Sequence, residues 1–352
     1  MASSKTQGHR RNGEFEYLCV DSFIKNLVEA RSLATAFEIG LIDFLIENKE
    51  CTFDSMQKQL KVDRHGIHLL IGLLLTNQVV ESCDERLRLS REFVRALKYR
   101  DLLELKLKIS NLAAHDFLNC FSDLVYRPEQ FVNKVSFIKL FSYDKCFKET
   151  KENYELTKRW MRITTTYTKY EAQVLMKYHD FSRYRRILDI GGNSGEFALQ
   201  ICRRYPGVSA TVFDLPLVCD IGLEHIRSGP EADRISFIKG NGLTDDFPKG
   251  FDLVIFKSML HDWPEKEAKQ FILKASQSLE PGGTLLIFER GPFEITEEPL
   301  FHSMIPFLLF FRSFRSPNIY EEHLKGLGFQ AIGIEKITLE TPFYLVTAAK
   351  KI

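Results

Sequence analysis

A histidine and two carboxylates of the types that transfer protons follow two apolar stretches in the second half of the sequence. His261 and Asp262 come shortly after the stretch 252–257, and Glu289 directly follows the stretch 284–288. Each stretch predicts a buried strand, and neighbouring parallel strands end at the same edge of a sheet. An imidazole with a pKa of about 6.5 can accept a proton at neutral pH. We therefore expect His261 to act as a general base, supported by Glu289 or Asp262.

Two other roles for His261 are less favoured by its surroundings. The imidazole could simply cap the helix that follows Pro264. A metal site is not expected, because no second histidine lies at ligand spacing in this part of the sequence.

A glycine-rich turn is the second feature whose residues could take part in the chemistry, in this case by binding a ligand. The apolar run 186–190 predicts a strand, Gly191, Gly192 and Gly195 follow it, and Asp214 ends the next predicted strand. Glycine lets the backbone approach a ligand closely, and a carboxylate about 20 residues further on can bind ribose hydroxyls. The glycines do not fall at the first, third and sixth positions of the dinucleotide fingerprint. The turn therefore predicts a nucleoside ligand of another kind.

The elements that must position these groups alternate between strands and helices over residues 179–352. This alternation is typical of an α/β fold with a seven-stranded, doubly wound, Rossmann-like sheet. The expected strands span 186–190, 210–213, 235–239, 252–257, 284–288, 330–337 and 343–349. Asn241 and Gly242 follow the third of them, at the strand ends where such sheets bind ligands.

The N-terminal part is mainly helical, and we expect its residues 15–100 to form a winged-helix-like dimerisation domain. Two helices followed by a hairpin are predicted between residues 52 and 89. The stretch 15–45 is apolar on several faces, which favours burial against a second copy of the chain. A winged helix can instead bind DNA, but the mostly apolar helix at 64–77 offers little to reach base edges.

Two further segments complete the domain organisation. Residues 1–14 are polar and are expected to form a disordered tail. Residues 101–178 are expected to be a helical linker, with a helix pair at 154–178. The aromatic residues of that pair either pack in the core or line an acceptor pocket.

The composition is that of a soluble globular protein. The 352 residues carry a formal net charge of +1, which argues against a phosphate-binding surface over the whole molecule. No signal peptide is expected, and the longest apolar run, 304–311, is too short to span a membrane. The seven cysteines show no Cys-x-x-Cys pair, which favours reduced thiols and a cytoplasmic location.

From about Phe15 to its end, the chain resembles the small-molecule O-methyltransferases of the caffeic acid and acetylserotonin type, which include bacterial natural-product enzymes. These belong to the class I methyltransferases that use S-adenosylmethionine (SAM). The matching segments are 188–195, 213–216, 240–241, 256–263 and 281–289. The His-Asp-Trp sequence at 261–263 is the most specific of these matches. One departure is Asn193, which stands where the motif usually has glycine.

The resemblance implies SAM as methyl donor, S-adenosylhomocysteine (SAH) as product, a homodimer and His261 as base with Glu289 as support. The implied cofactor-binding residues are Asp189, Gly191, Gly192, Gly195, Asp214, Leu215, Asn241, Gly242 and Lys257. Among them Gly191 would pack on the methionine part, Asp214 would bind the ribose and Asn241 would flank the adenine. Lys257 would lie near the amino-acid end of SAM or near the adenosine. Phe314 falls where plant members carry a second supporting glutamate.

The expected reaction is therefore methylation of a hydroxyl on an aromatic or polyketide-like small molecule. The alternatives are N- or C-methylation, a relative that binds SAM without methylating, and a SAM-sensing winged-helix regulator. A phenylalanine-rich segment would form a lid, a pocket wall or a dimer interface. Its apolar residues are Phe301, Met304, Phe307, Phe310, Phe311 and Phe314.

Overall fold

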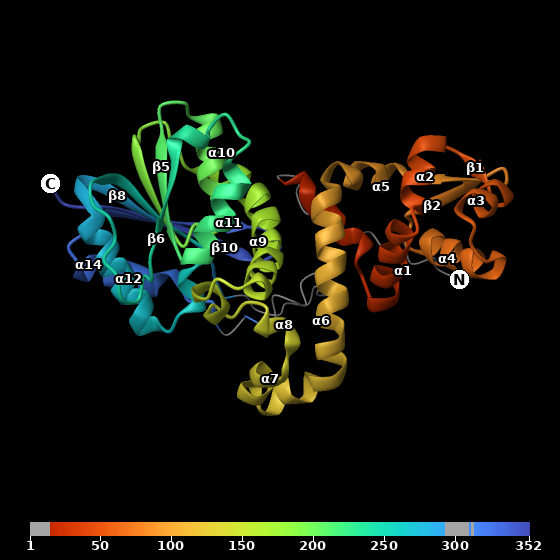
Figure 1. The fold of residues 1–352 in the computed structure, drawn as a ribbon, viewed down its shortest axis with the longest axis horizontal. Helices are drawn as coiled ribbons and strands as arrows, with labels where there is room; N and C mark the ends of the chain where they lie inside the picture. The colour runs from red at the N-terminus through yellow and green to blue at the C-terminus, as the bar shows by residue number, and fades with distance from the viewer. Residues whose placement is uncertain (1–14, 293–309, 311–312) are drawn as a thin grey trace, which may run out of the picture.

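A seven-stranded sheet forms the C-terminal half of the computed structural model, which describes residues 15–292, 310 and 313–352 (Figure 1). Its strands are β4 (Arg186–Ile190), β5 (Ser209–Asp214), β6 (Ile235–Lys239), β7 (Phe251–Lys257), β8 (Leu279–Arg290), β9 (Gln330–Thr338) and β10 (Pro342–Ala349). The strand order is β6-β5-β4-β7-β8-β10-β9. The first five of these strands are parallel, and β10 runs antiparallel to both β8 and β9. The predicted fold class is thus confirmed.

The strand order reverses at β4, which pairs with β5 on one side and with β7 on the other. In open α/β sheets, ligands bind outside the carboxyl ends of the strands at such a switch point. The glycine turn follows β4, and the His261 turn follows β7. The topology alone therefore brings the two predicted chemical features to one crevice.

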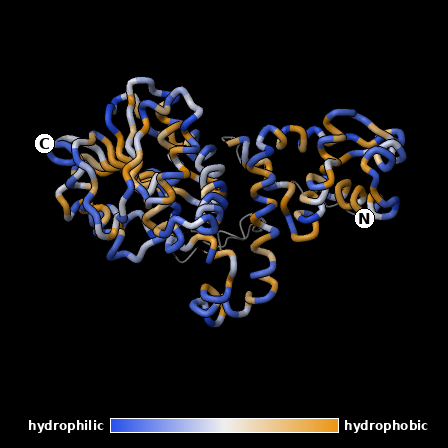
Figure 2. The backbone as a smooth tube through the Cα atoms, viewed as in Figure 1, coloured by the Kyte–Doolittle hydropathy of each residue, from blue (hydrophilic) through white to orange (hydrophobic). Residues whose placement is uncertain are grey.

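Helices cover both faces of the sheet because its strands are apolar on both sides. Alternate residues of β4 show this: Ile187 packs in one buried cluster and Leu188 in another. Figure 2 shows the apolar strands running through the centre of this half. The covering helices are α10 (Glu196–Arg204), α11 (Pro216–Ile226), α12 (Glu265–Ser278) and α14 (Pro317–Gly326).

The N-terminal elements follow the predicted order of helices and hairpin. The helices are η1 (Glu16–Phe23), α1 (Leu27–Glu38), α2 (Leu41–Asn48), α3 (Phe53–Leu60), α4 (Arg64–Thr76), α5 (Arg91–Ala96) and η2 (Leu97–Tyr99). The strands β1 (Cys51–Thr52), β2 (Val80–Cys83) and β3 (Arg86–Leu89) form a small antiparallel sheet in the order β1-β3-β2. The predicted tail at 1–14 lies outside the described residues.

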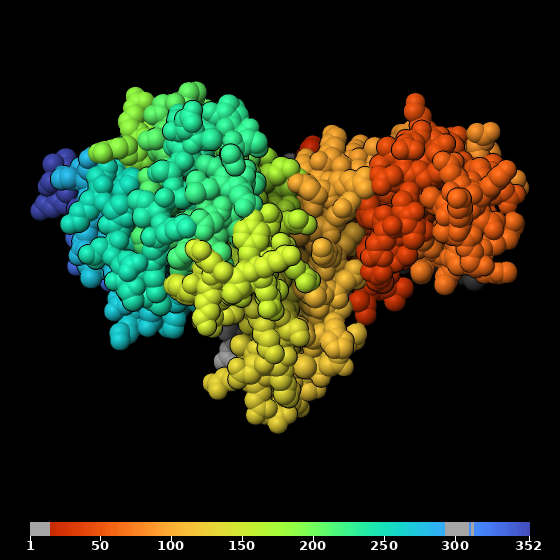
Figure 3. All heavy atoms as spheres, viewed as in Figure 1, coloured from red at the N-terminus to blue at the C-terminus, as the bar shows by residue number. Residues whose placement is uncertain are grey.

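Helices also form the connection between the two halves, which lie on opposite sides of it in Figure 3. They are α6 (Arg100–Tyr126), α7 (Pro128–Lys134), α8 (Ser136–Lys139), η3 (Asp144–Phe147) and α9 (Lys151–Tyr178). The predicted helix pair at 154–178 is wrong, because α9 is one continuous helix of 28 residues. It contains no glycine or proline, and the β-branched run Thr164–Thr166 lowers helix propensity without breaking the helix.

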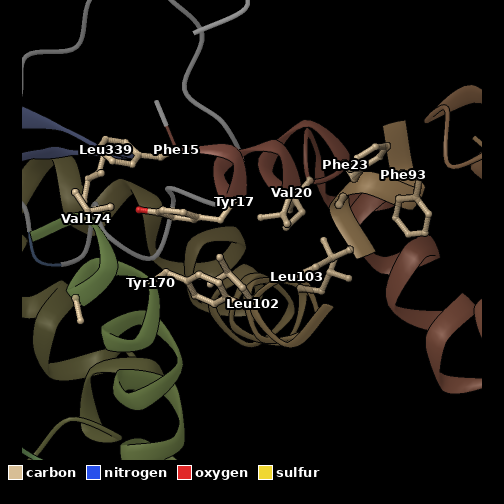
Figure 4. Packing of buried hydrophobic residues seen from close by; sticks show 14 of the residues in the cluster. Phe15, Tyr17, Val20, Phe23, Phe93, Leu102, Leu103, Tyr170, Val174 and Leu339 are labelled. Carbon is tan, nitrogen blue, oxygen red and sulfur yellow. The ribbon is translucent and has the colours of Figure 1, made fainter. Parts of the chain in front are cut away.

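Tyr17 packs the N-terminal region against α9 and the C-terminal half. Its ring lies 5.3 Å from that of Tyr170 on α9, close to Val174 and Leu339 (Figure 4). Next to this contact, the buried Lys106 Nζ lies 2.6 Å from Asp21 Oδ1 and 3.8 Å from Glu340 Oε1.

Among the described helices, none combines the length and the apolarity that crossing a membrane requires.

Candidate active site

The turn after β7 is built around the carboxylate of Glu289, which ends the predicted strand within β8 and is 2% exposed. Oε1 accepts hydrogen bonds from the backbone N–H groups of Met259 and Leu260, each at 2.7 Å. Oε2 lies 2.6 Å from His261 Nδ1. A carboxylate can only accept, so Nδ1 donates the proton and the lone pair is left on Nε2. The structure thus joins the two residues that the sequence predicted to meet.

Asp262 lies on the other side of the imidazole. Its Oδ1 is 3.3 Å from His261 Nε2, and its Oδ2 accepts a 2.5 Å hydrogen bond from the hydroxyl of Tyr143. Burial by itself lowers the pKa of His261, but the charges of Asp262 and Glu289 outweigh it and raise that pKa above 6.5. Burial raises the pKa of Asp262. The imidazole therefore sits between two carboxylates that favour its protonated form.

The glycine turn approaches its neighbours so closely that side chains would not fit. A Cβ on Gly191 would lie 2.6 Å from Met259 Cγ, and one on Gly192 would lie 2.6 Å from Asp189 Oδ2. Asn193 has a φ of 54°, so asparagine adopts the left-handed conformation at the position where the motif usually has glycine. Gly195 lies behind the turn at the start of α10, where a Cβ would meet Phe237, and it does not line the cavity.

Two carboxylates face the cavity beside this turn. Both oxygens of the buried Asp189 lack a hydrogen-bond partner among the described residues, and burial raises the pKa of Asp189 to about 7. Asp214 accepts from the backbone N–H groups of Asn193 at 2.8 Å and Leu215 at 2.7 Å. Burial raises the pKa of Asp214 to about 6. Asp189 therefore has capacity for a hydrogen-bond donor from a bound molecule.

Lys257 lines the cavity, but its ammonium is held within the protein. Its Nζ lies 2.5 Å from Glu171 Oε2 and 3.1 Å from Thr168 Oγ1, while Arg290 Nη2 lies 2.5 Å from Glu171 Oε1. Burial by itself raises the pKa of Glu171, but Lys257 and Arg290 outweigh it and lower that pKa. Glu171 and Arg290 were not predicted from the sequence, because Glu171 lies inside α9 and meets Lys257 of β7 and Arg290 of β8 only once the chain has folded.

Asn241 and Gly242 line the cavity beside Asp214, as their place after β6 predicted. The Asn241 side-chain oxygen accepts the N–H of Leu243 at 3.0 Å, so it stabilises its own turn. The Gly242 carbonyl accepts a hydrogen bond from Lys274 at 2.9 Å.

Aromatic side chains form much of the cavity wall, which encloses about 210 Å³. Trp160 and Tyr167 of α9 are among them, whereas Tyr170 of α9 packs in the buried core, so the aromatic residues of this helix both line the pocket and pack in the core. The Phe, Tyr and Trp side chains that line the cavity are Phe137, Phe141, Tyr143, Trp160, Tyr167, Phe197, Phe213, Trp263, Phe271, Phe310 and Phe314.

Phe310 and Phe314 come from the phenylalanine-rich segment, and both belong to the cavity wall, which is one of the alternatives expected for that segment. The Phe314 ring meets His261 edge-on at 5.4 Å. The other members of that segment, Phe301, Met304, Phe307 and Phe311, lie outside the described residues. Within the part of the chain that the structure describes, no group of three or more potential ligands could hold a metal.

Comparison with curated proteins finds several methyltransferases. A 3-hydroxy-5-methyl-1-naphthoate 3-O-methyltransferase of Streptomyces sahachiroi is 36% identical over 124 residues, which cover 35% of this chain and 36% of that protein. Acetylserotonin O-methyltransferase of Gallus gallus is 34% identical over 31% of each chain. The N,N-dimethyltransferase OxyT of Streptomyces rimosus is 30% identical over 39% of this chain and 40% of that protein. The matches thus span between about a third and two fifths of these relatives.

Solved structures show the same architecture over nearly the whole length. The human N-acetylserotonin methyltransferase, in complex with SAM, has a TM-score of 0.72 at 19% identity and covers 100% of both chains. The mitomycin 7-O-methyltransferase MmcR has a TM-score of 0.68 at 19% identity, covering 91% of this chain and 94% of that one. At these identities the likeness shows a shared fold.

Residues 121–330 match the model of a family described as the O-methyltransferase domain. The match covers more than half of the chain and includes the glycine turn, Asp214, His261 and Glu289. The chain therefore belongs to the O-methyltransferase domain family, which the motifs of its sequence predicted.

Proposed function

We propose that the protein is a SAM-dependent O-methyltransferase that methylates a hydroxyl of an aromatic or polyketide-like small molecule, with His261 as general base. The observation that carries the proposal is the environment of His261. Glu289 fixes its Nδ1 at 2.6 Å, and the ring lies at a cavity walled by aromatic side chains. The printed names of two relatives, a hydroxynaphthoate and an acetylserotonin O-methyltransferase, support an aromatic acceptor.

The residues beside the glycine turn fit SAM. Asp189 needs a donor, and the ammonium group of the methionine part can supply it. Each oxygen of Asp214 accepts one backbone N–H and has capacity left for a ribose hydroxyl. Gly191 and Gly192 let the side chains of Met259 and Asp189 pack directly against the turn that lines the cavity. Leu215, Asn241 and Gly242 line the far side, and Lys257, held by Glu171, completes the wall. We assign Gly195 to the shape of the turn.

Bound SAM would supply an electrophilic methyl group for an in-line displacement. The acceptor hydroxyl gives its proton to His261 Nε2, and its oxygen forms the new bond to the methyl carbon as the sulfur–carbon bond breaks, which leaves SAH. Glu289 keeps Nδ1 protonated, so the lone pair on Nε2 is available, and it stabilises the imidazolium that forms. Asp262 adds a second negative charge beside the ring.

A second candidate is methylation of an amine, because one relative is named as an N,N-dimethyltransferase. The same base could remove the proton that an amine loses on methylation. The mass and the fragmentation of the product distinguish a methyl group on oxygen from one on nitrogen.

We also propose that the protein is a cytoplasmic homodimer that pairs through residues 15–100. The N-terminal helices expose large apolar side chains, among them Val28 at 58%, Leu69 at 68% and Val94 at 51%. Large apolar side chains left exposed favour association when another surface covers them. All seven cysteines are free, which is compatible with a reducing compartment. Light scattering after gel filtration tests the dimer, and a monomer over the micromolar range would contradict it.

The test of the proposed function combines binding with product analysis. We expect titration calorimetry to show binding of SAH, and mass spectrometry of reactions with SAM and a panel of hydroxyarenes to show methylated products. His261→Gln should keep SAH binding and lose turnover by roughly 10²–10⁴-fold. His323→Gln is the matched control, because His323 binds the Lys269 carbonyl outside the cavity. Full turnover in His261→Gln would contradict the role of His261 as base. If the protein did not bind SAH, the proposed function itself would be contradicted.

A further inference from the structure

Tyr143 connects the helical region before α9 to the turn that carries His261. It directly precedes η3, and its ring stacks on Trp263 at 5.6 Å with an interplanar angle of 12°. A second aromatic contact, edge-on at 5.6 Å, is to Trp160 of α9. Its hydroxyl donates to Asp262 Oδ2 at 2.5 Å, across 119 residues of sequence. The ring is therefore fixed by packing, and the hydroxyl points at one carboxylate of the site.

The contact of Tyr143 determines where the other oxygen of Asp262 lies. With Oδ2 held by the hydroxyl, Oδ1 stays 3.3 Å from His261 Nε2. The terminal torsion of an aspartate is broad, so a carboxylate without such an anchor would rotate. Tyr143, Asp262, His261 and Glu289 thus form one chain of contacts along the cavity.

We propose that Tyr143 is a positioning residue for methyl transfer, whose hydroxyl holds Asp262 so that one carboxylate oxygen remains beside Nε2 of His261. The proposal rests on the proposed function in that it takes His261 as the base. Tyr143 touches neither imidazole nitrogen, so it acts through Asp262. It is also a residue that sequence motifs could not indicate, because it lies outside the strand ends.

The same hydrogen bond sets the proton affinity of the pair formed by Asp262 and His261. A donor to a carboxylate stabilises its charged form and weakens its attraction for a proton. Without the hydroxyl, Asp262 can rotate away from Nε2 and its charged form is less stable. Both effects remove negative charge from beside the imidazolium, so His261 takes up its proton at lower pH. Among the described residues, the other charged or titratable groups that face Tyr143, Asp262 and His261 are Asp214, Glu289, Arg290 and Cys146. Tyr143→Phe leaves all four in place.

The experiment follows His261 directly and needs no acceptor. The full-length protein, labelled with ¹³C at the histidine ring and saturated with SAH, is titrated by NMR. His261→Gln identifies the His261 signal among those of the nine histidines. We expect Tyr143→Phe, which keeps the stacked ring, to lower the midpoint of the His261 titration by about half a pH unit. An unchanged or raised midpoint would overturn the proposal.

Tyr154→Phe is the matched control. The Tyr154 hydroxyl also binds a carboxylate, Glu224, at 2.6 Å, but on the surface and away from the cavity. This variant should leave the His261 midpoint unchanged, and an equal shift in it would also contradict the proposal, because the effect would then not be local.

Turnover measurements distinguish a failure of this proposal from a failure of the proposed function. With the best hydroxyarene of the panel above, Tyr143→Phe should lower kcat about tenfold and leave KM for SAM within about twofold. A shifted midpoint with unchanged kcat would overturn the role in methyl transfer. Full turnover in His261→Gln would instead overturn the base itself, whatever the Tyr143 variant shows.

Discussion

Glu289 binds His261 Nδ1 with one oxygen and the backbone of the preceding residues, Met259 and Leu260, with the other. A single carboxylate thus fixes the fold of the turn, the tautomer of the imidazole and its orientation. Because Glu289 itself ends a buried stretch of β8, the sheet is the frame that holds the base. Glu289 is therefore the first residue to vary.

Glu289→Gln should inactivate the enzyme with little effect on SAH binding. If the amide oxygen of glutamine faces the two backbone N–H groups, its NH₂ faces Nδ1 and imposes the wrong tautomer. We expect kcat to fall roughly 10²–10⁴-fold. Glu280→Gln, on the same strand but in a surface pair with Arg186, should retain wild-type kcat. A Glu289→Gln enzyme within threefold of wild type would contradict the tautomer argument.

The pH dependence of turnover should follow the raised pKa of His261. The base must be neutral, so in wild type kcat/KM should rise with pH along a limb whose midpoint lies above 6.5. The free energy of unfolding should change with pH in the opposite direction. The stabilisation that protonated His261 gives is complete below about 6.5, the pKa of histidine in the unfolded chain, and it is lost as the pH rises through the higher pKa of His261 in the folded protein. Measuring kcat/KM and Tm against pH, for wild type and for His261→Gln, tests both of these pH dependences. A rate limb below pH 6.5 would contradict this prediction.

Asp189 should make SAH binding pH-dependent. Its pKa of about 7 means that the free protein holds a proton there at lower pH, whereas a ligand ammonium needs the carboxylate. Affinity should therefore increase with pH through about 7, with proton release on binding. Calorimetry in buffers of different ionisation enthalpy measures that release. Asp189→Asn should remove this dependence, whereas Asp220→Asn, in a surface pair with Lys239, should keep it.

Gly192→Ala should abolish SAH binding because its Cβ would lie 2.6 Å from Asp189 Oδ2. The carboxylate would have to move away from the position in which it faces the ligand. Gly72→Ala is an informative comparison, since Gly72 lies inside α4 and its added Cβ would meet no atom within 4 Å. That variant should bind SAH normally and gain about 1 kcal/mol of stability. Normal SAH affinity in Gly192→Ala would contradict the assignment of Asp189 and the glycine turn to SAM binding.

Lys106→Met should destabilise the fold strongly. The ammonium is fully buried between Asp21 and Glu340, and its removal leaves Asp21 without that charge partner. Breaking a buried ion pair costs roughly 3–5 kcal/mol, which urea unfolding measures. Lys108→Met, at an exposed position of the same helix, should change stability by less than about 0.5 kcal/mol. A loss below 1 kcal/mol in Lys106→Met would show that water replaces the ammonium.

The sequence allowed the pairing of His261 with Glu289 to be predicted because both residues follow apolar stretches, and strand ends of a parallel sheet meet at one edge. Asp189, Asp214 and the glycine turn were predictable for the same reason. These positions follow from local pattern and from the general topology of α/β sheets.

Tyr143, Glu171 and Arg290 were not predictable, because their contacts depend on how distant segments pack. Tyr143 reaches Asp262 across 119 residues, and Glu171 reaches Lys257 across 86. Neither Tyr143 nor Glu171 lies at a strand end. The continuity of α9 was missed because three consecutive threonines have low helix propensity, and burial of Ile163 and Tyr170 on either side outweighs that preference.

The unbroken α9 helix acts as a rigid rod of about 42 Å. Tyr170, in its second half, packs against Tyr17 of the N-terminal segment, whereas Trp160, one third of the way along, lines the cavity. Because a rigid helix moves as one body, a rearrangement of the N-terminal segment that moves Tyr170 also moves Trp160. Assembly, or a substitution in that segment, would therefore change the wall of the cavity beside His261.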